Sequence, residues 1–125
     1  VHSGWPGTDA HITTHALAAM TNTYGTSIAD VVAAIGPGIR VDAFEVGDEV
    51  YDAFCAAGFD MATVARRFEA KGHIDLSAAI QSDLNGVHAI YDCGICTHTS
   101  VHRFFSARRL GVHSGRIYSG IMLNQ

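Results

Sequence analysis

Charged side chains are scarce in this sequence. Asp, Glu, Lys and Arg make up 16% of the 125 residues, whereas about a quarter is typical of globular proteins. Because charged side chains normally cover the surface, we expect part of this surface to be covered by further polypeptide, either from the same chain or from a partner. The hydrophobic share of 48% is ordinary, and the length suffices for the core of a single domain.

Other absences exclude classes of function. The net charge is −4 with neutral histidines, so the chain lacks the basic excess typical of nucleic-acid binding. No apolar run reaches the length of a membrane span, and no signal peptide is visible, although the chain does not begin with methionine. Three cysteines, an odd number, favour a reducing compartment over a disulfide framework. We therefore expect a cytoplasmic protein that binds neither nucleic acid nor a membrane.

Helical and strand-like stretches alternate along the chain. Apolar runs rich in β-branched residues predict strands at 30–35, 87–91 and 117–123. Residues at helical spacing predict helices at 9–25, 47–58, 60–68 and 75–86, each of which begins at an aspartate or a glycine. All of them except 60–68 end at a glycine. This alternation predicts an α/β fold with a layered mixed sheet flanked by helices.

The first eight residues, VHSGWPGT, are an unusual N-terminus. They resemble the end of a buried strand that runs into a tight turn, as if cut from a longer chain. A lone histidine usually has no special role, but neighbouring glycines allow close backbone approach, and open sheets place ligands at strand ends. Neutral imidazole is also the commonest metal ligand. His2 is therefore a candidate metal-binding residue.

A Cys-x-x-Cys pair at Cys93 and Cys96 could bind zinc or form a redox pair. A closed zinc site would need two more ligands, for which the candidates are His98, His102 and His113. The chain has only one such pair, so the favoured interpretation is two small apolar side chains that fill a strand end. A structural Cys/His metal site remains the alternative.

Half of the eight basic residues lie close together near the C-terminus, at Arg103, Arg108, Arg109 and Arg116. Paired guanidinium groups bind phosphate or carboxylate in a bidentate manner. The adjacent arginines Arg108 and Arg109, together with Arg116, are therefore candidate anion-binding residues. A solvated basic face explains the same pattern equally well.

Four motifs, taken in order, resemble one known family. HSGWPGT resembles the His-Ala-Gly-Trp-Arg-Gly-Thr motif of the laccase-domain family, also called the polyphenol oxidase or purine nucleoside phosphorylase family. The other three motifs with family counterparts are AIGPGIRVDAFEVGDEV, HIDL, and CGICTHTS followed by FFSARRLGVHSGR. These matches keep the family order and span essentially all 125 residues.

The resemblance implies that residues 1–125 are the C-terminal portion of a single laccase-like domain. By this interpretation the domain is incomplete, its N-terminal half is missing, and the fragment alone is inactive. The family binds one zinc-type metal through two histidines and a cysteine, and His2 matches the histidine of the first motif. No cysteine of this chain matches the family's ligand cysteine. The resemblance thus implies that His2 is a catalytic metal ligand for zinc, with copper as the alternative.

The activity that the resemblance implies is that of a metal-dependent purine nucleoside enzyme. Such an enzyme would cleave adenosine or inosine with phosphate and would deaminate adenosine, with Arg108, Arg109 and Arg116 as the expected substrate-binding residues. A copper-dependent polyphenol oxidase and a non-catalytic binding module are the alternatives. Pro6 stands where the family usually has arginine or lysine, so we expect phosphorolysis to be affected more than deamination.

Overall fold

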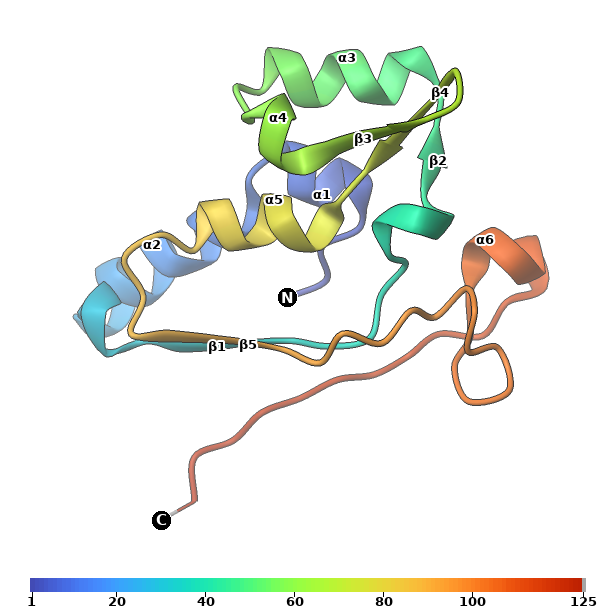
Figure 1. Ribbon diagram of the computed structural model, residues 1–125. Coiled ribbons are helices and arrows are strands. Elements are labelled where there is room, and N and C mark those ends of the chain that lie inside the picture. Colours follow the sequence, from blue (N-terminus) through green and yellow to red (C-terminus); the bar gives the residue numbers. More distant parts are fainter. Residues whose placement is uncertain (125) are drawn as a thin grey trace.

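A computed structural model describes residues 1–124 and shows a mixed α/β arrangement (Figure 1). The α-helices are α1 (Trp5–Asp9), α2 (Ile12–Tyr24), α3 (Asp48–Ala56), α4 (Met61–Val64), α5 (Leu76–Asp83) and α6 (Ala107–Leu110). Short 3-10 turns lie at Ile28–Asp30, Val41–Ala43 and Gly111–His113. The strands are β1 (Val32–Ile35), β2 (Glu45–Val46), β3 (Ala65–Phe68), β4 (Lys71–Ile74) and β5 (Ala89–Asp92). The predicted α/β class is confirmed.

The strands form two separate sheets. Strands β1 and β5 pair in parallel, from Val32 opposite Ala89 to Ile35 opposite Asp92. The other sheet is antiparallel with the order β2-β4-β3. In Figure 1 the antiparallel sheet lies with α3 and α4 at the top, and the parallel pair lies at the bottom beneath α5 and α2. The molecule therefore contains both parallel and antiparallel strand pairing, as a mixed sheet does, but divided between two small sheets.

The hydrophobic core lies between the antiparallel sheet and helices α3, α4 and α5. Phe54 of α3, Val64 of α4, Ile74 of β4 and Ala79 of α5 are almost completely buried. Helix α3 buries Val50 and Phe54, which lie four residues apart on one face, as the helical spacing predicts. This core belongs to residues 44–79 and leaves the parallel pair outside it.

The parallel pair is poorly covered. Val32 of β1 is 48% exposed and Tyr91 of β5 is 65% exposed, whereas parallel strands are normally buried on both faces. The strand predicted at 117–123 is absent: residues 115–124 have no regular secondary structure. Without ladder hydrogen bonds to a neighbouring strand, an apolar run alone does not form a strand.

Three of the four predicted helix starts are confirmed, including Gly47 before α3, and the start at Asp9 is wrong. Asp60 caps α4 through the Ala62 amide at 3.1 Å, and Asp75 caps α5 through the Ala78 amide at 3.0 Å. The helix predicted from Asp9 begins only at Ile12, because α1 is a separate helix. The part of 60–68 after Val64 turns out to be strand β3.

Candidate functional site

The candidate ligand His2 lies on a short segment that α1 holds in place. The buried Thr8 hydroxyl donates to the Gly4 carbonyl at 3.0 Å and lies 2.8 Å from Ser3 Oγ. The exposed His2 ring lies over Gly4, where a Cβ atom would come within 3.1 Å of His2 Nε2. Pro6 occupies the first turn of α1, where a backbone N–H needs no helical partner. Local bonds therefore fix the backbone beside His2.

The residues of this chain do not by themselves fit the expected metal. Within residues 1–124, no group of three His, Cys, Asp or Glu side chains is placed to hold a metal ion. A catalytic zinc ion normally needs three protein ligands, and His2 supplies one. The alternative structural site is not formed either, because Cys93 and Cys96 are not joined by nearby histidines in such a group.

Cys96 lies where the chain after β5 meets the chain after β1. It forms a parallel bridge with Gly38, whose carbonyl accepts from the Thr97 amide at 3.0 Å. Partial burial raises the pKa of the Cys96 thiol, but bonds from the backbone of Arg40, Thr99 and His98 outweigh this effect and lower the pKa. Thiolates are the reactive form of cysteine, so the lowered pKa of Cys96 favours that form.

The three candidate arginines form hydrogen bonds to different backbone carbonyls. Arg108 donates to the Glu45 carbonyl at 2.7 Å, and its guanidinium lies 4.9 Å from the centre of the Phe44 ring. Arg109 donates to the His98 carbonyl at 3.5 Å, at the limit of a hydrogen bond. The three side chains therefore do not share a single partner.

Arg116 makes only local contacts, donating to the carbonyls of Ser114 at 2.7 Å and Gly115 at 3.2 Å. The ion pairs among residues 1–124 are His11–Asp83, Arg40–Asp92 and Lys71–Glu45. Arg108, Arg109 and Arg116 thus have no carboxylate partner there and are exposed. Their positive charges are not neutralised and can attract an anion.

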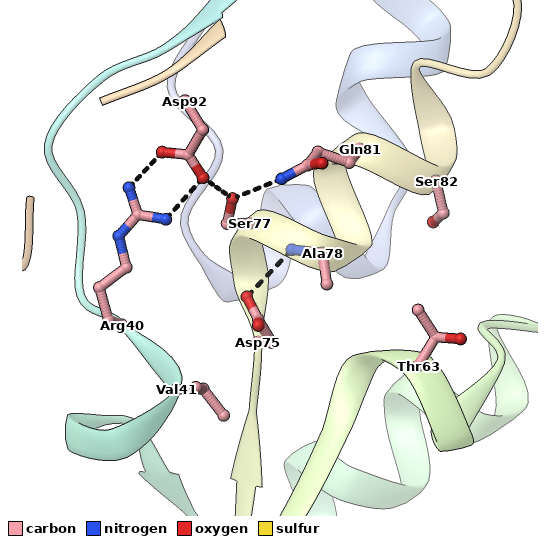
Figure 2. Close-up of a pocket in the computed structure, with 9 residues that line it drawn as sticks. All are labelled: Arg40, Val41, Thr63, Asp75, Ser77, Ala78, Gln81, Ser82 and Asp92. Carbon is pink, nitrogen blue, oxygen red and sulfur yellow. Dashed lines mark hydrogen bonds and ion pairs between the residues drawn. The ribbon is translucent and has the colours of Figure 1, made fainter. Parts of the chain in front are cut away.

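A cavity of about 420 Å³ lies beside the parallel strands (Figure 2). Most of the residues that line it are of polar or charged types, and the full set is Arg40, Val41, Thr63, Asp75, Ser77, Ala78, Gln81, Ser82 and Asp92. Asp92 is the last residue of β5, and Arg40 follows the Gly-Pro-Gly turn after β1. The carboxyl ends of parallel strands are where open α/β sheets bind ligands, so this cavity is the second candidate site.

One wall of the cavity is a connected hydrogen-bond network. Arg40 donates to both carboxylate oxygens of Asp92, with Nη1 2.7 Å from Oδ2 (Figure 2). The Ser77 hydroxyl donates to Asp92 and accepts from Gln81 Nε2 at 3.1 Å. The bonds from Arg40 are the main reason that the pKa of Asp92 lies far below its usual range, and the pKa of Arg40 is raised in turn. The two charges neutralise each other across the wall.

Sequence reasoning missed this network. Arg40 lies in one of the motifs with a family counterpart, but nothing in that motif predicts a role for it, and Asp92 lies in no such motif. Two signals were available: the position of Asp92 at the end of a strand, and the four-residue spacing of Ser77 and Gln81 on one helix face. Neither signal indicates which strand end lies beside which helix.

Comparison with known proteins matches this chain to the family that its sequence motifs resemble. The model of the family described as multi-copper polyphenol oxidoreductase laccase matches residues 1–124. The purine nucleoside phosphorylase of Bacteroides thetaiotaomicron is 47% identical over 131 residues, which covers 100% of this chain and 48% of that protein. Adenosine deaminase RL5 from an unknown prokaryotic organism is 43% identical, and the match covers 96% of this chain and 48% of that protein.

Solved structures agree on the fold. Neisseria meningitidis protein NMB0706 superimposes with a TM-score of 0.78 and 35% identity, covering 89% of this chain and 46% of that chain. YlmD from Geobacillus stearothermophilus gives a TM-score of 0.76 at 28% identity, and the match covers 87% of this chain and 43% of that chain. The chain therefore spans about half the length of the relatives it matches.

Proposed function

The chain belongs to the family described as multi-copper polyphenol oxidoreductase laccase, and we propose that it forms part of an enzyme acting on purine nucleosides. One observation carries the proposal: the whole chain aligns, at 47% identity, with a protein named purine nucleoside phosphorylase. A second relative, at 43% identity, is named adenosine deaminase. Phosphorolysis of adenosine or inosine and deamination of adenosine are therefore the two reactions to test.

His2 is the residue that we propose as a metal ligand, with zinc as the metal and copper as the alternative. The exposure of its ring and the bonds that fix the neighbouring backbone support this role. Because residues 1–124 supply no complete set of three ligands, the proposal requires that the remaining ligands come from another part of a complete family domain. The same part would cover the exposed parallel strands, of which Val32 and Tyr91 are the most exposed large residues.

Arg108, Arg109 and Arg116 are the proposed phosphate-binding residues. Their exposed guanidinium groups have no carboxylate partner among the described residues, and guanidinium groups bind phosphate strongly. A phosphate that is held in position next to the ribose is what phosphorolysis requires. Deamination uses water in place of phosphate, so the two reactions should depend differently on these arginines.

The direct test incubates the complete domain, including the part that supplies the remaining metal ligands, with adenosine or inosine, with and without phosphate, and separates the products by chromatography. Phosphorolysis yields free base and ribose-1-phosphate only when phosphate is present, whereas deamination converts adenosine to inosine without phosphate. Replacing Arg108 and Arg109 with glutamine should lower phosphorolysis more than deamination. The matched control is Arg67→Gln, at an exposed arginine of β3. Absence of both reactions in the metal-loaded protein would contradict the proposal.

A polyphenol oxidase is the second candidate, and the description of the matching family is the observation that favours it. Oxidation of a phenol by the copper-loaded protein, without turnover of adenosine or inosine, would support this candidate over the first. A non-catalytic module with a structural Cys/His metal is less well supported, because the described residues do not form that site.

A further inference from the structure

His11 lies at the junction of α1 and α2 and joins this junction to two other parts of the fold. Its Nδ1 atom lies 2.8 Å from Asp83 Oδ1 at the end of α5, and its Nε2 atom lies 3.0 Å from the Ala57 carbonyl oxygen just after α3. The ring stacks on Phe59, with centroids 4.6 Å apart and planes inclined by 20°. The backbone of His11 is left-handed, at φ 53°, which is uncommon for residues other than glycine.

The hydrogen-bond partners of His11 determine how many protons the ring carries. A carbonyl oxygen only accepts hydrogen bonds, so Nε2 must donate to Ala57. An ionised carboxylate also only accepts, so Nδ1 must donate to Asp83. A neutral imidazole has one N–H and can satisfy only one of these partners. Both bonds form together only when the pair of His11 and Asp83 holds an additional proton, as imidazolium and carboxylate.

The surrounding charges favour the same protonation state. The Asp83 side chain is 8% exposed, and its second oxygen, Oδ2, is buried without a hydrogen-bond partner. Asp9 of α1, whose Oδ1 is also buried without a partner, adds a second negative charge. The pKa of His11 is raised, first by the bond to Asp83 and then by the bond to Ala57, while burial opposes the shift. His15, one turn further along α2, is exposed.

We propose that His11 is a proton-dependent clamp that holds the α1–α2 junction against α5 and the end of α3. The clamp is closed while the pair of His11 and Asp83 keeps its additional proton. Loss of that proton leaves the Nδ1 lone pair facing a buried carboxylate, so the contact becomes repulsive. The His11 amide also donates to the Thr8 carbonyl at 2.9 Å, and the Thr8 hydroxyl contacts Ser3 and Gly4, so the junction is connected to the segment that carries His2.

The sign of the pH dependence follows from the raised pKa. The stabilisation is fully present below the pKa that the histidine has in the unfolded chain, about 6.5, and it is lost as the pH rises through the higher pKa of the folded state. Urea denaturation of the intact protein should therefore show a lower midpoint at about pH 9 than at about pH 5.5. This experiment does not depend on nucleoside turnover, so it can fail independently of the proposed function.

The variant His11→Asn separates the clamp from other titrating groups. Asparagine tolerates the left-handed backbone and keeps a donor, but it carries no titratable proton. We expect His11→Asn to lower the urea midpoint at about pH 5.5 and to reduce its fall toward about pH 9, whereas His15→Asn should behave as the unsubstituted protein. Equal falls in all three proteins would overturn the proposal.

A second measurement uses the unsubstituted protein and so does not depend on the folding of a variant. Ring-nitrogen chemical shifts of His11, recorded from about pH 5 to about pH 9, report directly whether both nitrogens carry protons. We expect the imidazolium form to persist above about pH 6.5, the ordinary midpoint for histidine. A His11 ring that loses its proton at or below this midpoint would also overturn the proposal.

Discussion

The pair of Arg40 and Asp92 at the cavity wall gives a sharp test of the structure. The substitution Asp92→Asn keeps the size of the side chain but removes its charge. Arg40 then loses the carboxylate that accepts from two of its nitrogens, and Ser77 and the Gly94 amide compete for one remaining oxygen. Arg40 Nε is already buried without a partner, so the substitution leaves a poorly satisfied cation next to the cavity.

The expected loss follows from the number of bonds and from their exposure. A hydrogen bond to a charged group contributes about 1.5–3 kcal/mol, and an exposed ion pair contributes about 0–1 kcal/mol. The side chains of Arg40 and Asp92 are 20% and 22% exposed, so water replaces part of what is lost. We therefore expect a free energy of unfolding lower by about 2 kcal/mol, and a melting temperature lower by about 8 °C.

The assay is thermal and urea denaturation of Asp92→Asn beside Asp52→Asn, a control at an exposed aspartate of α3. Because the pKa of Asp92 is lowered in the folded state, its contribution is present above the unfolded pKa and is lost as the pH falls through the folded pKa. The difference between the two variants should therefore be constant from about pH 8 to about pH 5 and should shrink in stronger acid. Equal stability of the two variants at neutral pH would show that the bonds of Asp92 to Arg40 and Ser77 do not stabilise the fold.

Two further predictions concern the core and the cysteines. Phe54→Ala, at a side chain with no exposed surface, should lower the free energy of unfolding by about 3–5 kcal/mol, whereas Phe68→Ala, at a 43% exposed position, should cost much less when both are measured by urea denaturation. Cys96, whose pKa is lowered from the ordinary value of 9.0, should react with iodoacetamide at a lower pH than a cysteine with that ordinary pKa. Peptide mass spectrometry across a pH series measures the rate at which Cys96 is alkylated. A rate that reaches half its maximum only at or above the ordinary pKa of cysteine would contradict the lowered pKa of Cys96.

Local features of the fold could be predicted from the sequence because their causes are local. Asp60 and Asp75 cap the helices that follow them, and Gly25 ends α2 with a left-handed conformation at φ 67°. The β3–β4 hairpin was missed for a local reason as well. Its turn places Glu69 at φ 57°, whereas the residues expected at such a position are glycine, asparagine and aspartate.

The cavity wall and the His11 contacts could not be predicted, because they depend on tertiary placement. Arg40 and Asp92 lie 52 positions apart, and His11 and Asp83 lie 72 positions apart. No periodicity links such residues, and the strand pairing that brings the first pair together is not encoded in local propensity. The strand predicted at 117–123 failed for a related reason, since a β-strand needs a partner as well as a suitable composition.

We propose that this chain contributes His2 to the metal site of a purine nucleoside enzyme. The most direct test compares His2→Ala with His15→Ala, at an exposed histidine of α2, in the complete domain that supplies the remaining metal ligands, and measures bound zinc and the turnover of adenosine in the same samples. We predict that His2→Ala loses both the bound zinc and the turnover, while His15→Ala keeps both. Full zinc content and unchanged turnover in His2→Ala would contradict the claim.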